Sequence, residues 1–209
     1  MWSPTPVYGF RAWEIAGDTQ EYDGGGGGFL STYERHPKGT LLGKVEAWPT
    51  ARKEAICHRT SLSMDAVTAG HAPENHDAPH WGCHCGVYVC DDPNHESVKS
   101  VSRLTPYAWQ IRTRGVHAIG IVELTGTIVE HQRGARGQYG EIRHLWVTPR
   151  YADEVALTYP DVPVTVVDYP DCSDEEFYSS HLREIDRTRL YEEMCDAKRS
   201  MEEDEPWRR

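Results

Sequence analysis

Alternating apolar and polar positions predict a sheet-rich domain over the first three quarters of the chain. The pattern over Val7–Ile15 is typical of a strand, and Val116–Leu124 is a second, strongly β-rich stretch. Thr127–His131 continues the second pattern after Gly126, where we expect a bulge or bend. These stretches predict at least two long strands.

A hairpin is predicted after the second long strand. Gln132–Gly137 has the composition of a turn, and Tyr139–Val147 returns as the partner strand. Strict alternation predicts two faces for the returning strand. One face carries Ile142, His144 and Trp146, and the other carries Arg143, Leu145 and Val147.

Shorter elements are predicted on either side of this hairpin. Leu41–Trp48 and Val162–Val167 are strand candidates. A short helix is predicted over Ala51–His58 with Thr50 as its N-cap. Another is predicted over Arg150–Tyr159, and Pro149 opens it as the N1 residue.

The C-terminal part of the chain has a different character. Ser173 has the chemistry of an N-cap and is followed by acidic residues, which predicts a helix to about Glu203 with a thin apolar stripe and a disordered tail. We therefore predict a zinc-stapled β-rich domain over residues 1–167 and an acidic C-terminal helix and tail over residues 168–209. The expected fold class is α+β, with a mostly antiparallel, partly closed sheet or barrel.

The composition of the chain bears on the kind of partner it can bind and on the compartment in which we expect it. The formal net charge of −11 argues against general binding to a phosphate backbone. An acidic protein more readily meets a basic partner, but most acidic proteins are simply soluble. No apolar run reaches the roughly 18 residues of a membrane span, and the first residues lack the pattern of a signal peptide. We therefore expect a cytoplasmic protein whose 6 cysteines are metal ligands or free thiols.

The most informative stretch is a loop rich in cysteine and histidine. His76, His80, Cys83, His84 and Cys85 lie close together between proline and glycine residues that interrupt regular structure. Such donors at such density are typical of a zinc site.

The expected ligands are Cys57, His76, Cys83 and Cys85. His80 or His71 is the alternative to His76, and Cys90 is the reserve for Cys57. Several thiolates favour a closed structural zinc ion over a catalytic one, and neither an H-E-x-x-H motif nor a deaminase motif is present.

Two other features bear on ligand binding. His131, Arg136 and Tyr139 lie on the predicted hairpin and form a candidate site for a phosphate or carboxylate, with Tyr139 stacking on a base or sugar. An ordinary polar hairpin tip with a satisfied salt bridge is the favoured interpretation, since hairpin tips are normally polar. The Gly24–Gly28 run lacks the Lys-Ser/Thr pair that a phosphate-binding loop requires.

The motif H-x-A-P-x₃-C-x-C-G-V-Y, from His76 to Tyr88, resembles a pattern in small uncharacterised proteins of actinobacteria and their phages. The resemblance extends to E-H-x₂-G-x-R-x₂-Y, from Glu130 to Tyr139, to an upstream cysteine like Cys57, and to a G-x-R-x-W start at Gly9. It covers roughly residues 7–167 and implies a shared metal site without assigning an activity. The glycine run and the acidic C-terminal helix depart from the pattern.

These observations favour a non-enzymatic, zinc-stabilised interaction protein, encoded by a phage or mobile element, that binds a host protein. Two alternatives stay open. The first is a nucleic-acid or nucleotide binder that uses the Arg133–Arg143 hairpin, and the second is a zinc-dependent hydrolase or transferase with an open metal position.

Overall fold

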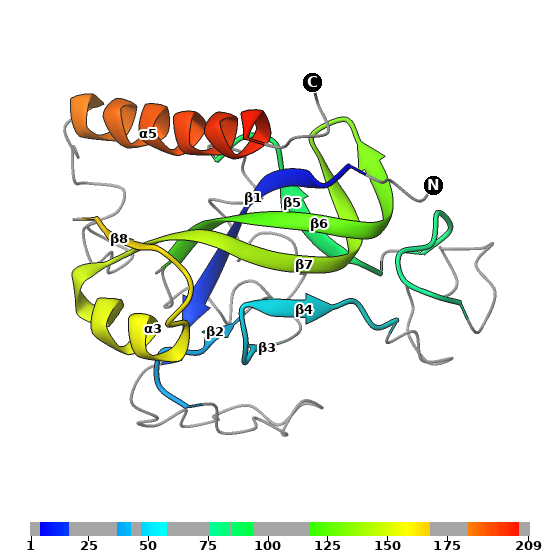
Figure 1. Cartoon of the computed structure of the whole chain (residues 1–209), viewed down its shortest axis with the longest axis horizontal. Coiled ribbons are helices and arrows are strands. Elements are labelled where there is room, and N and C mark those ends of the chain that lie inside the picture. Colours follow the sequence, from blue (N-terminus) through cyan, green and yellow to red (C-terminus); the bar gives the residue numbers. More distant parts are fainter. Residues whose placement is uncertain are drawn as a thin grey trace, which may run out of the picture.

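The computed structural model describes residues 5–16, 37–42, 47–57, 76–83, 85–93, 118–167 and 184–204. Within these residues, eight strands form one mixed sheet (Figure 1). The strands are β1 (Val7–Ile15), β2 (Leu41–Leu42), β3 (Ala47–Trp48), β4 (Arg52–Glu54), β5 (Val87–Cys90), β6 (Ala118–His131), β7 (Gly134–Val147) and β8 (Val164–Val166). The helical elements are the 3₁₀ turn η2 (Pro149–Tyr151), α3 (Ala152–Thr158) and α5 (Glu184–Glu203).

The sheet is mostly antiparallel, as the alternating patterns predicted. β1 pairs with β6 along most of its length and with β5 at Phe10, while β5 and β6 both pair with β7. These four strands therefore form a closed circuit of pairings. β8 runs parallel to β7 at its other end, which makes the sheet mixed.

The β6–β7 hairpin turns more tightly than predicted. His131 pairs with Gly134, so the turn consists of Gln132 and Arg133 and the predicted turn over Gln132–Gly137 is too long. Gly134 adopts φ +151, and a Cβ at this position would collide with the carbonyl of Val89. This close approach allows β7 to pair with β5 immediately after the turn.

Two register shifts interrupt the β6–β7 ladder. The shift between Thr125 and Ile128 lies at Gly126, where a bulge was predicted. The shift between Ile121 and Val122 was not predicted, and it moves Ile142 into the same apolar cluster as Leu145. The alternation predicted for β7 is therefore wrong at Ile142, since one extra residue exchanges the faces on either side of a bulge. Beyond the bulge it is confirmed, because Leu145 and Val147 share the larger cluster while the ring of His144 contacts Trp146.

Two short predicted elements are also corrected. Leu41–Trp48 is not one strand, because β2 and β3 pair antiparallel with each other. The helix predicted over Ala51–His58 is wrong, because β4 lies there and pairs with Glu141, Gly140 and Tyr139 of β7. The Thr50 hydroxyl donates to the carbonyl of Arg52 instead of capping a helix.

The sheet buries an apolar cluster on each of its two faces. The larger cluster includes Trp13, Trp48 and Leu145, and α3 contributes Val155 to it. The smaller cluster includes Phe10 and Trp146 and lies under α5. Figure 1 shows α5 across one side of the sheet and α3 near the opposite side. Both faces are thus covered.

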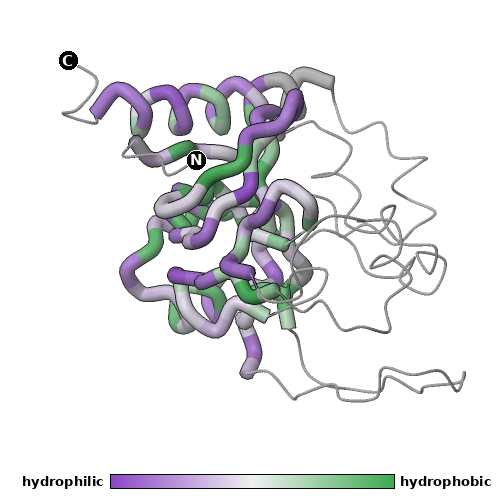
Figure 2. The backbone as a smooth tube through the Cα atoms, turned by 90° about the vertical axis from the view of Figure 1, so that its right-hand side faces the viewer, coloured by the Kyte–Doolittle hydropathy of each residue, from purple (hydrophilic) through white to green (hydrophobic). Residues whose placement is uncertain are grey.

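α5 contacts the sheet through a narrow apolar stripe. Met194 is buried in the smaller cluster, Leu190 and Ala197 pack beside it, and the Trp146 indole donates to Glu193 at 3.1 Å. Most of the remaining helix is hydrophilic (Figure 2). Within the described chain, no helix combines the length and apolar character needed to cross a membrane. The predicted helix start at Ser173 and the Gly24–Gly28 run lie outside the described residues.

Tyr159, just after α3, joins the helix to the β2–β3 pair. Its buried hydroxyl donates to the carbonyl of Trp48 and accepts from the amide of Leu41 at 2.8 Å. Burial raises the pKa of Tyr159 to about 12, so the phenol keeps the proton that it donates.

We expect Tyr159→Phe to lower the free energy of unfolding by about 1–3 kcal/mol, because it leaves a buried amide and a buried carbonyl without this partner. Chemical denaturation measures the loss. Leu157→Ala is the matched control, since Leu157 lies on the exposed side of α3. A Tyr159→Phe variant as stable as the native chain would contradict this role.

His144 provides a pH-dependent contribution to stability. Its ring stacks on Trp146 at 4.3 Å, and its Nε2 lies 2.9 Å from the Thr165 hydroxyl. Burial lowers the pKa of His144 below its ordinary 6.5, against the opposing effect of the Glu193 carboxylate. Above the ordinary pKa the ring is neutral in both states. As the pH falls, the unfolded chain takes up the proton first, so folding loses stability.

We therefore expect the native chain to lose more stability than His144→Gln between about pH 7.5 and about pH 5.5. Urea denaturation of both proteins at each pH measures the difference. The comparison uses the change with pH, so a constant packing loss in the variant does not affect it. Equal pH dependence in the two proteins would rule out the contribution of His144.

Candidate metal centre

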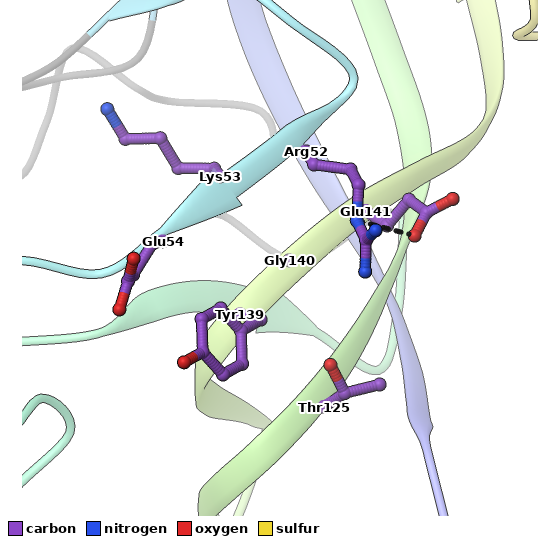
Figure 3. A pocket seen from close by; sticks show the side chains of 7 residues that line it. All are labelled: Arg52, Lys53, Glu54, Thr125, Tyr139, Gly140 and Glu141. Carbon is purple, nitrogen blue, oxygen red and sulfur yellow. Dashed lines mark ion pairs between the residues drawn. The ribbon is translucent and has the colours of Figure 1, made fainter.

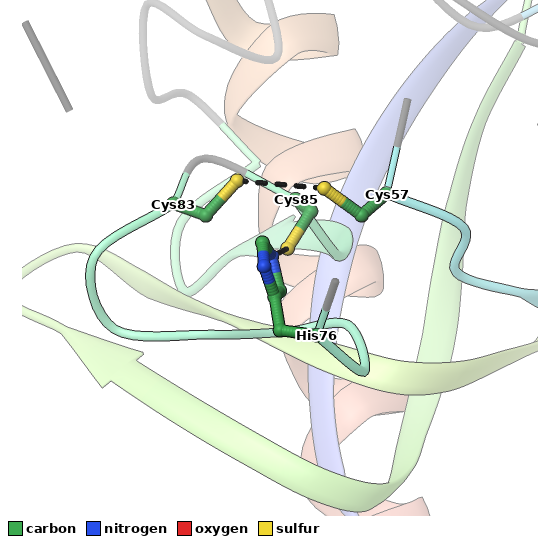
Figure 4. Close-up of side chains that lie close together, drawn as sticks. All are labelled: Cys57, His76, Cys83 and Cys85. Atoms are coloured by element: carbon green, nitrogen blue, oxygen red, sulfur yellow. Dashed lines mark hydrogen bonds between the residues drawn. The ribbon is translucent and has the colours of Figure 1, made fainter. Parts of the chain in front are cut away.

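Two separate segments bring four potential ligands together. Cys57 follows β4, while His76, Cys83 and Cys85 lie on the loop that leads into β5. The four ligand atoms all lie within 4.8 Å of one another. Figure 4 shows the four side chains pointing toward one another from these two segments. The structure therefore gathers the four residues that the sequence selected.

The spacing of the ligand atoms fits tetrahedral coordination. Cys57 Sγ and Cys83 Sγ are 3.7 Å apart, and His76 Nε2 and Cys85 Sγ are 3.3 Å apart. Two sulfur atoms that each lie about 2.3 Å from one zinc ion, at a tetrahedral angle, are roughly 3.8 Å apart. All three cysteines are free thiols. The cluster is thus compatible with a bound metal ion.

The alternative ligands lie elsewhere or outside the described residues. The Nδ1 of His80 accepts from the amide of Gly82 at 3.1 Å, and the carbonyl of His80 accepts from Cys83 N at 2.9 Å. His80 thus shapes the turn before Cys83. Cys90 lies in β5 and packs against the smaller apolar cluster, and His71 is outside the described chain.

Arg136 fastens this loop to the sheet. Its side chain is buried, with 3% of the residue exposed, and its guanidinium points at the loop. The guanidinium donates to the carbonyl oxygens of His80 (3.1 Å), Cys85 (3.2 Å), Trp81 (3.5 Å) and Cys83. The donors that we expected to hold a phosphate or carboxylate are therefore directed at the backbone of the ligand loop.

The three residues of the predicted hairpin site do not converge. His131 is exposed at the end of β6, next to the turn, whereas Arg136 lies in β7 between Val129 and Tyr88 of the neighbouring strands. Tyr139 is exposed and pairs with Glu54 of β4. One buried and two exposed residues at separate positions along the hairpin do not form a common binding site.

Crowding of the thiols makes their ionisation unequal. Burial opposes ionisation of Cys83, but hydrogen bonds from the Cys85 backbone and the Cys57 side chain outweigh it and lower the pKa of the Cys83 thiol to about 7. Burial and the nearby Cys83 sulfur raise the pKa of Cys85 to about 12. A divalent cation among the sulfur atoms favours the thiolate form of each ligand. The three closely spaced thiols are therefore chemically suited to binding a metal ion.

A separate hollow of about 320 Å³ lies over β4 and β7 (Figure 3). Its lining consists of Arg52, Lys53, Glu54, Thr125, Tyr139, Gly140 and Glu141. Arg52 and Glu141 form an ion pair of 3.2 Å at its edge. This hollow could not be predicted from the sequence, because it depends on the pairing of β4 with β7.

Comparisons with protein families, curated proteins and solved structures find no match to this chain. The candidate centre therefore rests on the residues and geometry of the chain itself. The contribution of Arg136 to this centre was not predicted from the sequence. The sequence marked Arg136 only as a candidate anion ligand and as part of the motif from Glu130 to Tyr139, far along the chain from the ligand loop.

We expect Arg136→Lys to weaken metal affinity by about 10–100-fold, because a single ammonium group cannot reach the carbonyls that the guanidinium fork holds. Competition with a chromogenic chelator measures the affinity. Arg133→Lys, at the exposed turn of the same hairpin, is the matched control. An Arg136→Lys variant with native affinity would show that the loop is held without the guanidinium.

Proposed function

We propose that Cys57, His76, Cys83 and Cys85 bind one structural zinc ion. The observation that carries this proposal is the meeting of four ligand atoms within 4.8 Å, from two segments that are separate in sequence. Three sulfur donors and one imidazole are the donor set of a common class of structural zinc sites. Magnesium and calcium prefer oxygen ligands, so this set disfavours both.

The charge around the cluster supports the same assignment. Zinc bound by three thiolates and one neutral imidazole has one net negative charge. The buried guanidinium of Arg136, which contacts the carbonyls of Cys83 and Cys85, supplies a compensating positive charge. A buried charge is costly unless it is paired and hydrogen-bonded, and here each charge offsets the other.

We further propose that the metal organises a binding surface in a non-enzymatic protein that interacts with another protein. Four protein ligands complete a tetrahedral site, whereas a catalytic zinc ion needs a position open to water or substrate. This favours the structural role over the hydrolase or transferase alternative. The nucleic-acid alternative is weakened because Arg136, its central residue, is buried.

Metal analysis of the purified, untagged protein tests the zinc assignment. We expect about one zinc ion per chain by elemental mass spectrometry, and loss of that zinc together with a lower melting temperature in Cys83→Ala/Cys85→Ala. Cys195→Ser is the matched control, because this free thiol lies on α5 and is not among the four clustered residues.

A folded native protein without metal would overturn the proposed centre. Iron in place of zinc would overturn the choice of metal and retain the ligands. Cobalt substitution tests for tetrahedral coordination, since cobalt held tetrahedrally by thiolates absorbs visible light intensely. The double cysteine variant must lack this absorption.

A further inference from the structure

Large apolar side chains are exposed beside the candidate metal centre. Ile56 is 61% exposed and immediately precedes Cys57, and Trp81 is 69% exposed and lies two residues before Cys83. Cys57 Sγ and Cys83 Sγ are 3.7 Å apart, so the two exposed residues flank one cluster. Single exposed apolar residues are ordinary, but two that flank an ordered centre mark a candidate interaction surface.

The backbone around both residues is held in place. The carbonyl of Trp81 accepts from Arg136 at 3.5 Å, and the next turn is closed by Cys83 N donating to His80 O at 2.9 Å. Ile56 lies between Cys57 and Ala55, whose amide donates to the carbonyl of Gln138 at 2.8 Å. Side chains presented from a fixed backbone lose less conformational freedom on binding.

Two acidic side chains that form no ion pair within the described residues lie next to this surface. Glu54 and Asp77 are exposed, each a few residues from an exposed apolar side chain. Among the described residues, three cations lie nearby. Arg52 is paired with Glu141, and Arg136 is buried under the loop. The half-buried Lys53 directs its ammonium to the carbonyl of Ala47 at 3.1 Å, away from the exposed acidic pair. The whole chain has a formal charge of −11. A partner of positive charge therefore matches the surface, whereas nucleic acid or a second copy of this chain would be repelled.

We propose that Ile56 and Trp81 form the anchor surface for a basic polypeptide segment. Lysine or arginine side chains of the partner lie over the indole face of Trp81, and apolar side chains of the partner contact Ile56. Tyr88 is not part of this surface, because its ring already lies 5.8 Å from the guanidinium carbon of Arg136. The inference rests on the proposed metal centre, which fixes the loop that presents Trp81.

The test measures binding of two fluorescent peptides to the zinc-loaded full chain by anisotropy. One peptide is rich in arginine and leucine, and the other has glutamate in place of arginine. We expect detectable binding of the basic peptide alone, and Trp81→Ala to weaken it by about tenfold or more while zinc content stays native. Leu157→Ser, which replaces an exposed apolar residue on α3, is the matched control and should bind as the native chain does.

Three outcomes would overturn the surface while leaving the metal centre intact. They are no binding of the basic peptide by a zinc-loaded chain, equal binding of the acidic peptide, and native binding by zinc-loaded Trp81→Ala. The last would show attraction by net charge alone. Absence of metal from the native chain is instead the failure of the proposed centre, and the zinc measurement on the same sample separates the two failures.

Discussion

The buried guanidinium of Arg136 is the interaction on which the candidate centre depends. The loop from His76 to Gly86 contains no helix or strand among its described residues, so its backbone carbonyls need donors from elsewhere. Arg136 supplies them from β7, the strand that pairs with β4, β5, β6 and β8. The loop is thereby attached to the most highly paired strand of the sheet.

The same strand also positions the other half of the cluster. β4 pairs with Tyr139–Glu141 of β7, and the chain continues from β4 directly to Cys57. One strand thus fixes Cys57 through a backbone ladder and fixes Cys83 and Cys85 through a side chain. A metal ion at their meeting point would connect two segments that the sheet has already brought close, and would not have to gather them from an unfolded chain.

Apolar side chains are buried on both faces of the sheet, which stabilises the strands that position the cluster. α3 and Tyr159 close the larger cluster, and α5 covers the smaller cluster through Met194 and the contact of Glu193 with Trp146. Because the two clusters bury Trp13, Trp48 and Trp146 among other large side chains, the sheet has an apolar core independent of the metal. A metal ion at the cluster would therefore order the loop locally, and the fold of the sheet would not depend on it.

The sequence by itself determined the long strands and the identity of the four clustered residues. Both depend on local chemistry: alternation with a period of two marks β1 and β6, and a dense group of thiols and imidazoles marks the loop. The features that depend on long-range strand pairing were decided by the tertiary structure alone. It made β4 a strand where a cap-like Thr50 suggested a helix, because pairing with β7 outweighs weak local propensity. It also shifted the faces of β7 at an unpredicted bulge and buried Arg136 under the loop, since the depth of a side chain depends on which distant segment lies across it.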